Sequence, residues 1–170
     1  MDLLKYIREV PDFPKPGILF KDITTLLKDP AALDTAVRRL ADPYRNEDVS
    51  VVAGIESRGF ILGAAVARDL GAGFVPIRKS GKLPSQTASA NYVLEYGTDS
   101  IEIHTDAVTP GQRVLLLDDL LATGGTMEAA VSLVKGLGGQ IPGISFLIEL
   151  TALDGRSRLK GENVTALVSC

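Results

Sequence analysis

The sequence predicts an α/β fold: a central, mainly parallel and twisted sheet with helices on both faces, plus a flexible hairpin flap. The strand candidates are short and continuously apolar, which is typical of strands that are buried on both faces. They alternate along the chain with segments of helical periodicity, and this alternation indicates a parallel sheet. The expected strands are residues 49–55, 74–77, 113–117, 144–150 and 164–168, and the expected helices between them are residues 59–70 and 126–137.

The N-terminal elements are predicted from apolar spacing and from proline. Residues 3–10 place apolar side chains at helical spacing and predict a short amphipathic helix. Prolines and a glycine between residues 11 and 17 then break regular structure. Asp29 before Pro30 is typical of an N-cap followed by proline in the first turn, so a helix is expected from there to about Leu40.

The later elements are bounded by glycine and proline. Gly71 ends the helix of residues 59–70, and Gly138 ends the helix of residues 126–137. Residues 80–100 are polar and irregular, although residues 92–96 and 101–104 alternate as in a hairpin. We expect residues 80–100 to form a mobile flap that excludes water from a reactive intermediate when it closes.

Composition bounds the function classes. With 170 residues the chain is most simply one domain, and its net charge of −3 argues against nucleic-acid binding. No basic run, apolar stretch of transmembrane length or signal peptide occurs, so no membrane partner is expected. The only cysteine is Cys170, which fits a cytoplasmic location. The single histidine, His104, is expected on an exposed strand, and no protein metal site is predicted.

The most informative motif is VLLLDDLLATGGT at residues 114–126, an apolar strand, a small glycine-rich loop and a helix start. Backbone N–H groups of small residues can surround an anion, and the following helix adds its positive N-terminal end. Thr123 and Thr126 add hydroxyl donors. The loop lacks the lysine of a Walker A motif and the G-x-G-x-x-G spacing of dinucleotide-binding loops. It therefore indicates a phosphate site, against the alternative of a plain Gly-Gly turn.

Asp118 and Asp119 lie at the carboxyl end of this strand. Adjacent strand side chains point to opposite faces, so a turn is expected here if both are to face one ligand. Vicinal hydroxyls of a ribose or a magnesium ion bound through water would suit two carboxylates. The alternative is a solvated strand end with a capping role.

Two further loops follow expected strands and carry cations. In residues 54–60, Arg58 lies at a helix start, where a cation is unfavourable unless an anion is bound nearby. It is a candidate phosphate ligand, or else a solvent-facing partner of Glu56. Residues 78–82 hold three cations, which indicate either a second phosphate site or a solvated basic loop.

At these residues the chain resembles the type I phosphoribosyltransferases. The string at residues 114–126 is similar to the family's motif for phosphoribosyl pyrophosphate. Further segments resemble the branch of the family that acts on adenine, and together the matches extend from about residue 2 to 150. These segments are FPKPGILFKDIT (13–24), GIESRGF (54–60), IRKSGKLP (77–84) and LEYG (94–97).

The resemblance implies an enzyme of purine salvage, which transfers 5-phosphoribosyl from phosphoribosyl pyrophosphate to N9 of adenine and gives AMP and pyrophosphate. It also implies Mg²⁺ held mainly through pyrophosphate and water, and a homodimer. The single domain, residues 1–170, would contain an N-terminal base-binding segment, residues 1–30, and a catalytic flap of about residues 80–100.

The family's functional residues transfer by motif position. The resemblance implies that the 5′-phosphate lies on Ala122, Thr123, Gly124, Gly125 and Thr126, and the ribose hydroxyls on Asp118 and Asp119. Pyrophosphate would face Arg58, Lys79 and Lys82, with Arg78 reaching that site in its own or a neighbouring subunit. Adenine would stack on Phe20, be read by backbone groups of Leu19 and Lys21, and lie near Glu95.

Some assignments stay open from the residues themselves. Glu95 can act as an acid or base toward a nitrogen heterocycle and Tyr96 can pack on a sugar or base, but the pattern alone favours a cross-strand pair in a hairpin. Two other functions compete with adenine transfer. One is transfer to a 6-oxopurine such as xanthine, and the other is a non-catalytic regulator that senses phosphoribosyl pyrophosphate.

Overall fold

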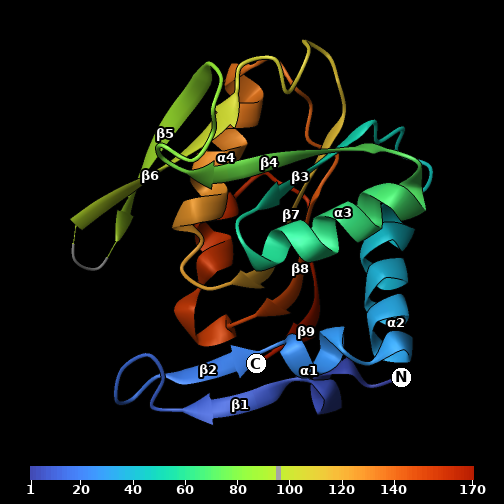
Figure 1. Ribbon diagram of the computed structural model, residues 1–170, viewed down its shortest axis with the longest axis vertical. Coiled ribbons are helices and arrows are strands. Elements are labelled where there is room, and N and C mark those ends of the chain that lie inside the picture. Colours follow the sequence, from blue (N-terminus) through green and yellow to red (C-terminus); the bar gives the residue numbers. More distant parts are fainter. Residues whose placement is uncertain (95–96) are drawn as a thin grey trace.

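The computed structural model describes residues 1–94 and 97–170 and contains a seven-stranded sheet in the order β5-β6-β4-β3-β7-β8-β9 (Figure 1). The strands from β4 to β9 in this order run parallel, and β6 and β5 are antiparallel additions at one edge. The mainly parallel sheet predicted from the sequence is therefore confirmed. The strand bounds are β3 Val51–Ile55, β4 Gly73–Lys79, β5 Thr87–Leu94, β6 Gly97–His104, β7 Val114–Leu121, β8 Ile144–Glu149 and β9 Val164–Ser169.

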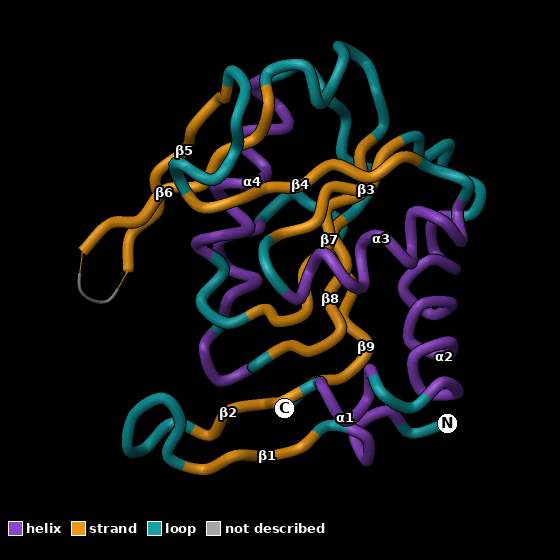
Figure 2. The backbone as a smooth tube through the Cα atoms, in the orientation of Figure 1, coloured by secondary structure: helices purple, strands orange, loops and turns teal. Residues whose placement is uncertain are grey.

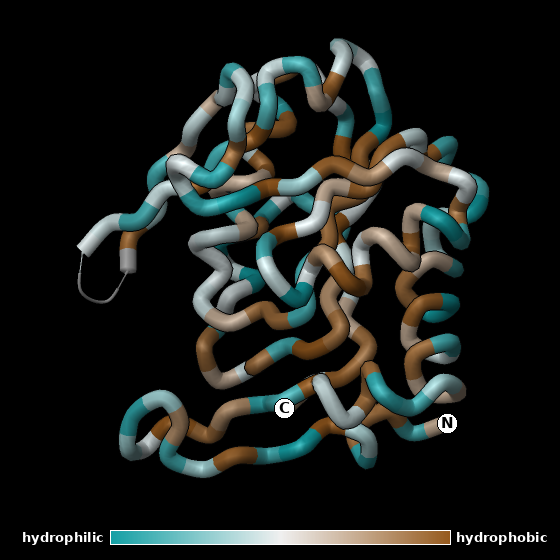
Figure 3. The backbone as a smooth tube through the Cα atoms, viewed as in Figure 1, coloured by the Kyte–Doolittle hydropathy of each residue, from teal (hydrophilic) through white to brown (hydrophobic). Residues whose placement is uncertain are grey.

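Helices cover both faces of the sheet, as Figure 2 shows. Helices α2 (Pro30–Ala41) and α3 (Arg58–Leu70) pack on one face, and α4 (Gly125–Gly136) packs on the other. Each face of the sheet has its own hydrophobic core, and alternate residues of the central strands pack into one or the other. In β7, Leu116 packs into the core under α4, whereas Leu115 and Leu117 pack into the core under α2 and α3. Figure 3 shows the hydrophobic residues gathered along these central strands. Burial on both faces explains why the strands read as continuous apolar runs.

The predicted helix ends are confirmed at α2 and α3. The Asp29 side chain accepts hydrogen bonds from the N–H groups of Ala31 and Ala32, at 3.0 and 2.9 Å, and Pro30 occupies the first turn. Gly71 ends α3 in a left-handed conformation with φ of 68°, which glycine adopts without strain.

The helix predicted over residues 3–10 is wrong. The chain forms a single 3₁₀ turn, Leu3–Tyr6, and then strand β1 (Arg8–Pro11), which pairs antiparallel with β2 (Leu19–Asp22). Helices of this length are marginal in water, and the hairpin gains ladder hydrogen bonds and the cross-strand pair Val10 and Phe20. A short helix α1 (Thr24–Leu27) follows, and the hairpin lies beside the C-terminal end of the chain (Figure 1).

The flap is more regular than the sequence indicated. Residues 87–94, expected to be largely irregular, form β5, and β5 pairs in continuous register with β6 from Thr87 opposite His104 to Leu94 opposite Gly97. The remaining short elements are 3₁₀ turns at Asp42–Tyr44, Thr151–Leu153 and Gly155–Leu159. None of the helices in the described part of the chain combines the length and apolar character needed to cross a bilayer.

The cap at Asp29 gives a direct test of how α2 is held. We expect Asp29→Ala to lower the free energy of unfolding by about 1 kcal/mol, because two N–H groups lose their acceptor. The melting temperature should fall by about 2–4 °C, measured by calorimetry.

The matched control on the same helix is Asp34→Ala, which removes only an exposed ion pair with Arg38. This substitution should lower the free energy of unfolding by less than about 0.5 kcal/mol. Equal losses in the two variants would contradict the capping role of Asp29.

Candidate active site

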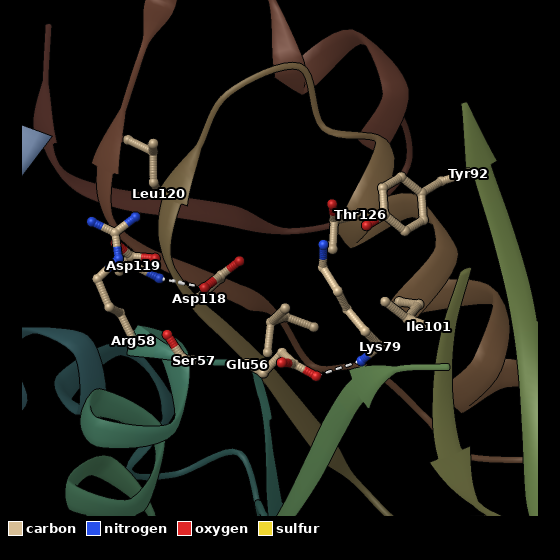
Figure 4. Close-up of a pocket in the computed structure, with 11 residues that line it drawn as sticks. Glu56, Ser57, Arg58, Lys79, Tyr92, Ile101, Asp118, Asp119, Leu120 and Thr126 are labelled. Atoms are coloured by element: carbon tan, nitrogen blue, oxygen red, sulfur yellow. Dashed lines mark hydrogen bonds and ion pairs between the residues drawn. The ribbon is translucent and has the colours of Figure 1, made fainter. Parts of the chain in front are cut away.

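The site lies where β3 leaves the sheet beside β7. The two strands pair only as far as Gly54 opposite Leu117, after which β3 turns into α3 and β7 continues to Leu121 against β8. This leaves a cavity of about 300 Å³ at the carboxyl ends of the strands, where ligands bind in open α/β sheets. It is lined by Ile55, Glu56, Ser57, Arg58, Lys79, Tyr92, Ile101, Asp118, Asp119, Leu120 and Thr126 (Figure 4).

The turn expected at the two acids is absent, because β7 remains a strand through Asp118 and Asp119. Both side chains nevertheless line the cavity, since β3 no longer covers β7 at this point. Asp118 Oδ1 accepts the N–H of Asp119 at 2.8 Å. A Cβ atom on Gly59 would lie 2.8 Å from that same oxygen, so the start of α3 approaches Asp118 only because residue 59 is glycine.

The surroundings of these two carboxyl groups in the cavity disfavour their charged forms. Burial raises the pKa of Asp118 well above its ordinary range, and the neighbouring charge of Asp119 raises it further. Burial also raises the pKa of Asp119, although Arg58 opposes that shift. Burial therefore disfavours the charged forms of both carboxyl groups, and their oxygens remain available as acceptors in the cavity.

Arg58 joins three parts of the site. Its Nε lies 3.0 Å from Asp119 Oδ2, its guanidinium carbon lies 5.1 Å from the ring centre of Phe20, and it donates to the carbonyl of Lys21 at 3.4 Å. The carboxylate of Asp119 offsets the unfavourable position of a cation at the start of α3. The alternative pairing of Arg58 with Glu56 does not occur.

The three cations of residues 78–82, predicted to lie in a loop, differ in their contacts, and β4 includes Arg78 and Lys79. Lys79 lines the cavity, and its N–H donates to Glu56 Oε1 at 2.5 Å (Figure 4). Arg78 instead lies 3.5 Å from the same Glu56 oxygen and packs over the ring of Phe60 at 5.9 Å. Lys82 is exposed, and its carbonyl accepts from Arg78 at 3.4 Å. Of the three cations, Lys79 is the one that the described structure brings into the cavity.

Asp99 and Tyr92 were missed by sequence reasoning. Asp99 Oδ2 lies 3.1 Å from Lys79 Nζ and accepts the hydroxyl of Tyr92, also at 3.1 Å. The hydrogen bond from Lys79 contributes to lowering the pKa of Asp99, after the larger effect of the Ser100 N–H, and Asp99 raises the pKa of Lys79. The alternation of the hairpin was the available signal, because its register pairs Tyr92 with Asp99.

The glycine-rich loop has the geometry predicted for it. Ala122 to Thr126 line a second cavity of about 80 Å³, which also touches Asp118. Gly124 adopts φ of 85°, and α4 begins at Gly125, so the helix N-terminus points at this space. Asp118, Leu120 and Thr126 line both cavities, so the two cavities are adjacent.

The three residues that the resemblance assigned to adenine lie on β2. Phe20 is half-buried, contacts Phe13 edge to face at 5.2 Å, and lies against Arg58. Leu19 is 47% exposed, and the buried ammonium of Lys21 is ion-paired with Glu9. Arg58 therefore connects β2 to the cavity, through the Phe20 ring and the Lys21 carbonyl.

The other singled-out residues contribute less. His104 Nε2 accepts from the N–H of Ser85 at 3.4 Å and does not line the cavity. Glu95 and Tyr96 lie outside the described residues. Within residues 1–94 and 97–170, no group of three or more histidine, cysteine, aspartate or glutamate side chains is arranged to hold a metal ion.

Known proteins with the same sequence pattern and fold identify the family. The family model described as a phosphoribosyl transferase domain matches residues 22–162. The adenine phosphoribosyltransferase of Parvibaculum lavamentivorans is 58% identical over 170 residues, which are 100% of this chain and 97% of that protein. The chain belongs to the adenine phosphoribosyltransferases.

Solved structures of this family agree with the fold. The enzyme from Rhodothermus marinus is 54% identical, with a TM-score of 0.95 over 99% of this chain and 96% of that one. The enzyme from Saccharomyces cerevisiae is 38% identical, with a TM-score of 0.91 over 96% of each chain. That structure was solved with D-2,5-dideoxy-2,5-imino-altritol 1,6-bisphosphate and adenine.

The charge on Asp118 gives a prediction of stability against pH. Because its folded pKa is raised, the folded state prefers the neutral carboxyl, and the stability that this form provides is lost as pH rises through the folded pKa. Asp118→Asn removes the cost and keeps an oxygen acceptor for the Asp119 N–H. We expect the variant to melt about 2–4 °C above the wild type at about pH 8, measured by calorimetry.

The difference in melting temperature between the variant and the wild type should shrink toward about pH 4, because the wild-type Asp118 carboxyl is then protonated and neutral. A variant that melts below the wild type at about pH 8 would contradict the uncompensated charge at Asp118.

Proposed function

We propose that the chain transfers the 5-phosphoribosyl group from phosphoribosyl pyrophosphate to N9 of adenine, giving AMP and pyrophosphate in purine salvage. The observation that carries this proposal is the pair of carboxylates that opens onto the same site as an anion-binding helix N-terminus. Such a site suits one ligand with a phosphate and vicinal hydroxyls. The family to which the chain belongs supports adenine as acceptor, and its curated relatives give no support to a 6-oxopurine or to a regulator.

The 5′-phosphate is assigned to the loop Ala122–Thr126. Its backbone N–H groups and the first turn of α4 supply donors and a positive end. The small cavity over the loop touches Asp118, so a phosphate bound there would lie beside the acids. This arrangement supports binding of the ribose hydroxyls by Asp118 and Asp119, which have oxygen acceptors to spare.

The pyrophosphate is assigned to the cationic side of the larger cavity. Lys79 already lines it, and Arg58 lies at its edge beside Asp119. Lys82 is exposed and free to reorient, and Arg78 would act in its own subunit or in the second subunit of a homodimer. Positive charge here stabilises the leaving group, on which negative charge develops as the C–O bond breaks.

Magnesium fits the donor set. It prefers oxygen ligands, keeps several waters and is usually held by one or two carboxylates together with substrate phosphates. Asp118 and Asp119 are hard oxygen donors with raised pKa values, so a cation nearby would offset their charge. Bound mainly through pyrophosphate and water, Mg²⁺ would neutralise charge on the leaving group.

Adenine is assigned to the face of Phe20, with the backbone of Leu19 and Lys21 reading its edge. Arg58 supports this assignment, because it touches the Phe20 ring and the Lys21 carbonyl while it pairs with Asp119. The base would therefore lie next to the ribose. Glu95 is assigned to the imidazole side of the base and Tyr96 to packing against substrate.

The chain's residues act chiefly by position and charge. Cleavage at the anomeric carbon builds positive charge on the ribose, as in glycoside hydrolysis, and the carboxylates of Asp118 and Asp119 favour that charge. The flap of about residues 80–100 excludes water, which would otherwise compete with adenine. We assign the reaction to a single domain, residues 1–170, with base-binding segment 1–30, acting as a cytoplasmic homodimer.

The decisive experiment is formation of AMP from adenine and phosphoribosyl pyrophosphate, with and without Mg²⁺, in parallel with hypoxanthine, guanine and xanthine. We expect turnover with adenine and Mg²⁺ and little with the oxopurines. Turnover of an oxopurine without turnover of adenine would reject the proposal. Retardation of nucleic acid without pyrophosphate release would favour a regulator.

A pair of variants tests the location of the site. Asp119→Ala removes an acceptor and the partner of Arg58, so kcat/KM should fall by about a hundredfold or more. His104→Ala lies outside the cavity and should stay within about twofold of the wild type. Comparable rates for the two variants would show that the site is misplaced.

A further inference from the structure

The chain that leaves β8 folds back against the loop Ala122–Thr126. Leu150 N–H donates to the carbonyl of Leu121 at 2.9 Å, and the backbone then reaches Gly155, which is buried. A Cβ atom on Gly155 would overlap the carbonyl oxygen of Ala122, and a Cβ atom on Gly124 would overlap the carbonyl oxygen of Gly155. Two backbones therefore pack directly on each other, and residue 155 must be glycine for this approach.

The position of Gly155 is fixed by its neighbour Arg156. The Arg156 guanidinium donates to both carboxylate oxygens of Glu149, at 2.7 and 2.8 Å, and to the carbonyl of Val164 at 2.8 Å. Glu149 is the last residue of β8 and is 6% exposed, and Val164 is the first residue of β9. This bidentate pair holds the segment to the rigid sheet.

A second link runs from the same segment to α4, where Arg158 lies 3.1 Å from Glu128. Both side chains are about half exposed, so this pair contributes little to the position of the loop. The support of the loop therefore rests on Gly155 and Arg156. Neither residue lines either of the two cavities of the site.

We propose that Gly155 and Arg156 are positioning residues that set the loop Ala122–Thr126 against the 5′-phosphate, an inference that rests on the role proposed above for that loop. The backbone N–H groups of the loop bind an anion only if they point at it, and Gly155 packs against the loop at the carbonyl of Ala122 and at Gly124. Moving that carbonyl turns the donors away. Displacements of about 1 Å in positioning groups can cost about a hundredfold in activity.

The test compares Gly155→Ala with Gly161→Ala, a matched glycine just beyond the same segment. Gly161 has φ of 88° and no atom within contact of an added Cβ, so its substitution strains the backbone without touching the loop. We expect Gly155→Ala to raise the KM for phosphoribosyl pyrophosphate about tenfold or more while the KM for adenine stays within about twofold. Gly161→Ala should lower the melting temperature and leave both KM values unchanged.

An unchanged KM for phosphoribosyl pyrophosphate in Gly155→Ala, or an equal rise of that KM in Gly161→Ala, would overturn the proposal. If Gly155→Ala does not fold, Arg156→Lys decides. It keeps the charge but cannot form the bidentate pair, so the same KM should rise about threefold or more. A folded Arg156→Lys protein with wild-type KM values would likewise overturn it.

Thr126→Ala separates this inference from the assignment of the phosphate site. If Thr126→Ala weakens the binding of ribose 5-phosphate in calorimetry and Gly155→Ala does not, the loop binds phosphate and the positioning role fails. If neither Thr126→Ala nor Gly155→Ala changes that binding, the assignment of the loop to the 5′-phosphate fails, and the positioning role fails with it.

Discussion

The site depends on one constraint, the placement of two adjacent carboxylates at the end of a buried central strand. Asp118 and Asp119 follow four fully buried residues of β7 and occupy the point where β3 no longer covers that strand. Burial raises the pKa of both, and in the described structure only Asp119 has a cation directly beside it. The fold thus carries an electrostatic cost at these two carboxyl groups, as is common at functional sites.

Arg58 links these carboxylates to the rest of the site. It begins α3, pairs with Asp119, lies against Phe20 and donates to the Lys21 carbonyl. A change in the charge of Asp119 is therefore expected to alter the contacts of Arg58 with Phe20 and Lys21, in the segment assigned to the base. This contact links the N-terminal hairpin, which lies outside the main sheet, to the cavity at the carboxyl ends of the central strands.

The sequence predicted those structural features that depend on residues close to one another in the chain. The cap at Asp29, the apolar central strands and the glycine-rich loop before α4 each follow from residues near one another in the chain. The helix over residues 3–10 was wrong because pairing with β2, a tertiary contact, outweighed helical spacing. The turn expected at Asp118 was wrong because the opening comes from β3 leaving the sheet, which only the topology shows.

Side chains brought together across the fold were the hardest to predict. Lys79, Asp99 and Tyr92 meet through the hairpin register, and Gly155 meets Ala122 through the return of the chain after β8. Alternation in the hairpin was the only signal for the first set, and the contact of Gly155 with Ala122 has no signature in local spacing. The partner of Arg58 was also open from the sequence, which offered a bound phosphate or Glu56, and the structure pairs it with Asp119, which is distant in the chain.

The most direct test of this account is the structure of the chain with AMP bound. The account predicts that the ribose hydroxyls lie within hydrogen-bonding distance, about 2.5–3.2 Å, of the carboxylates of Asp118 and Asp119. The phosphate should lie on Ala122–Thr126 and the base on Phe20. AMP bound with its ribose away from both carboxylates, or with its phosphate away from that loop, would contradict the account.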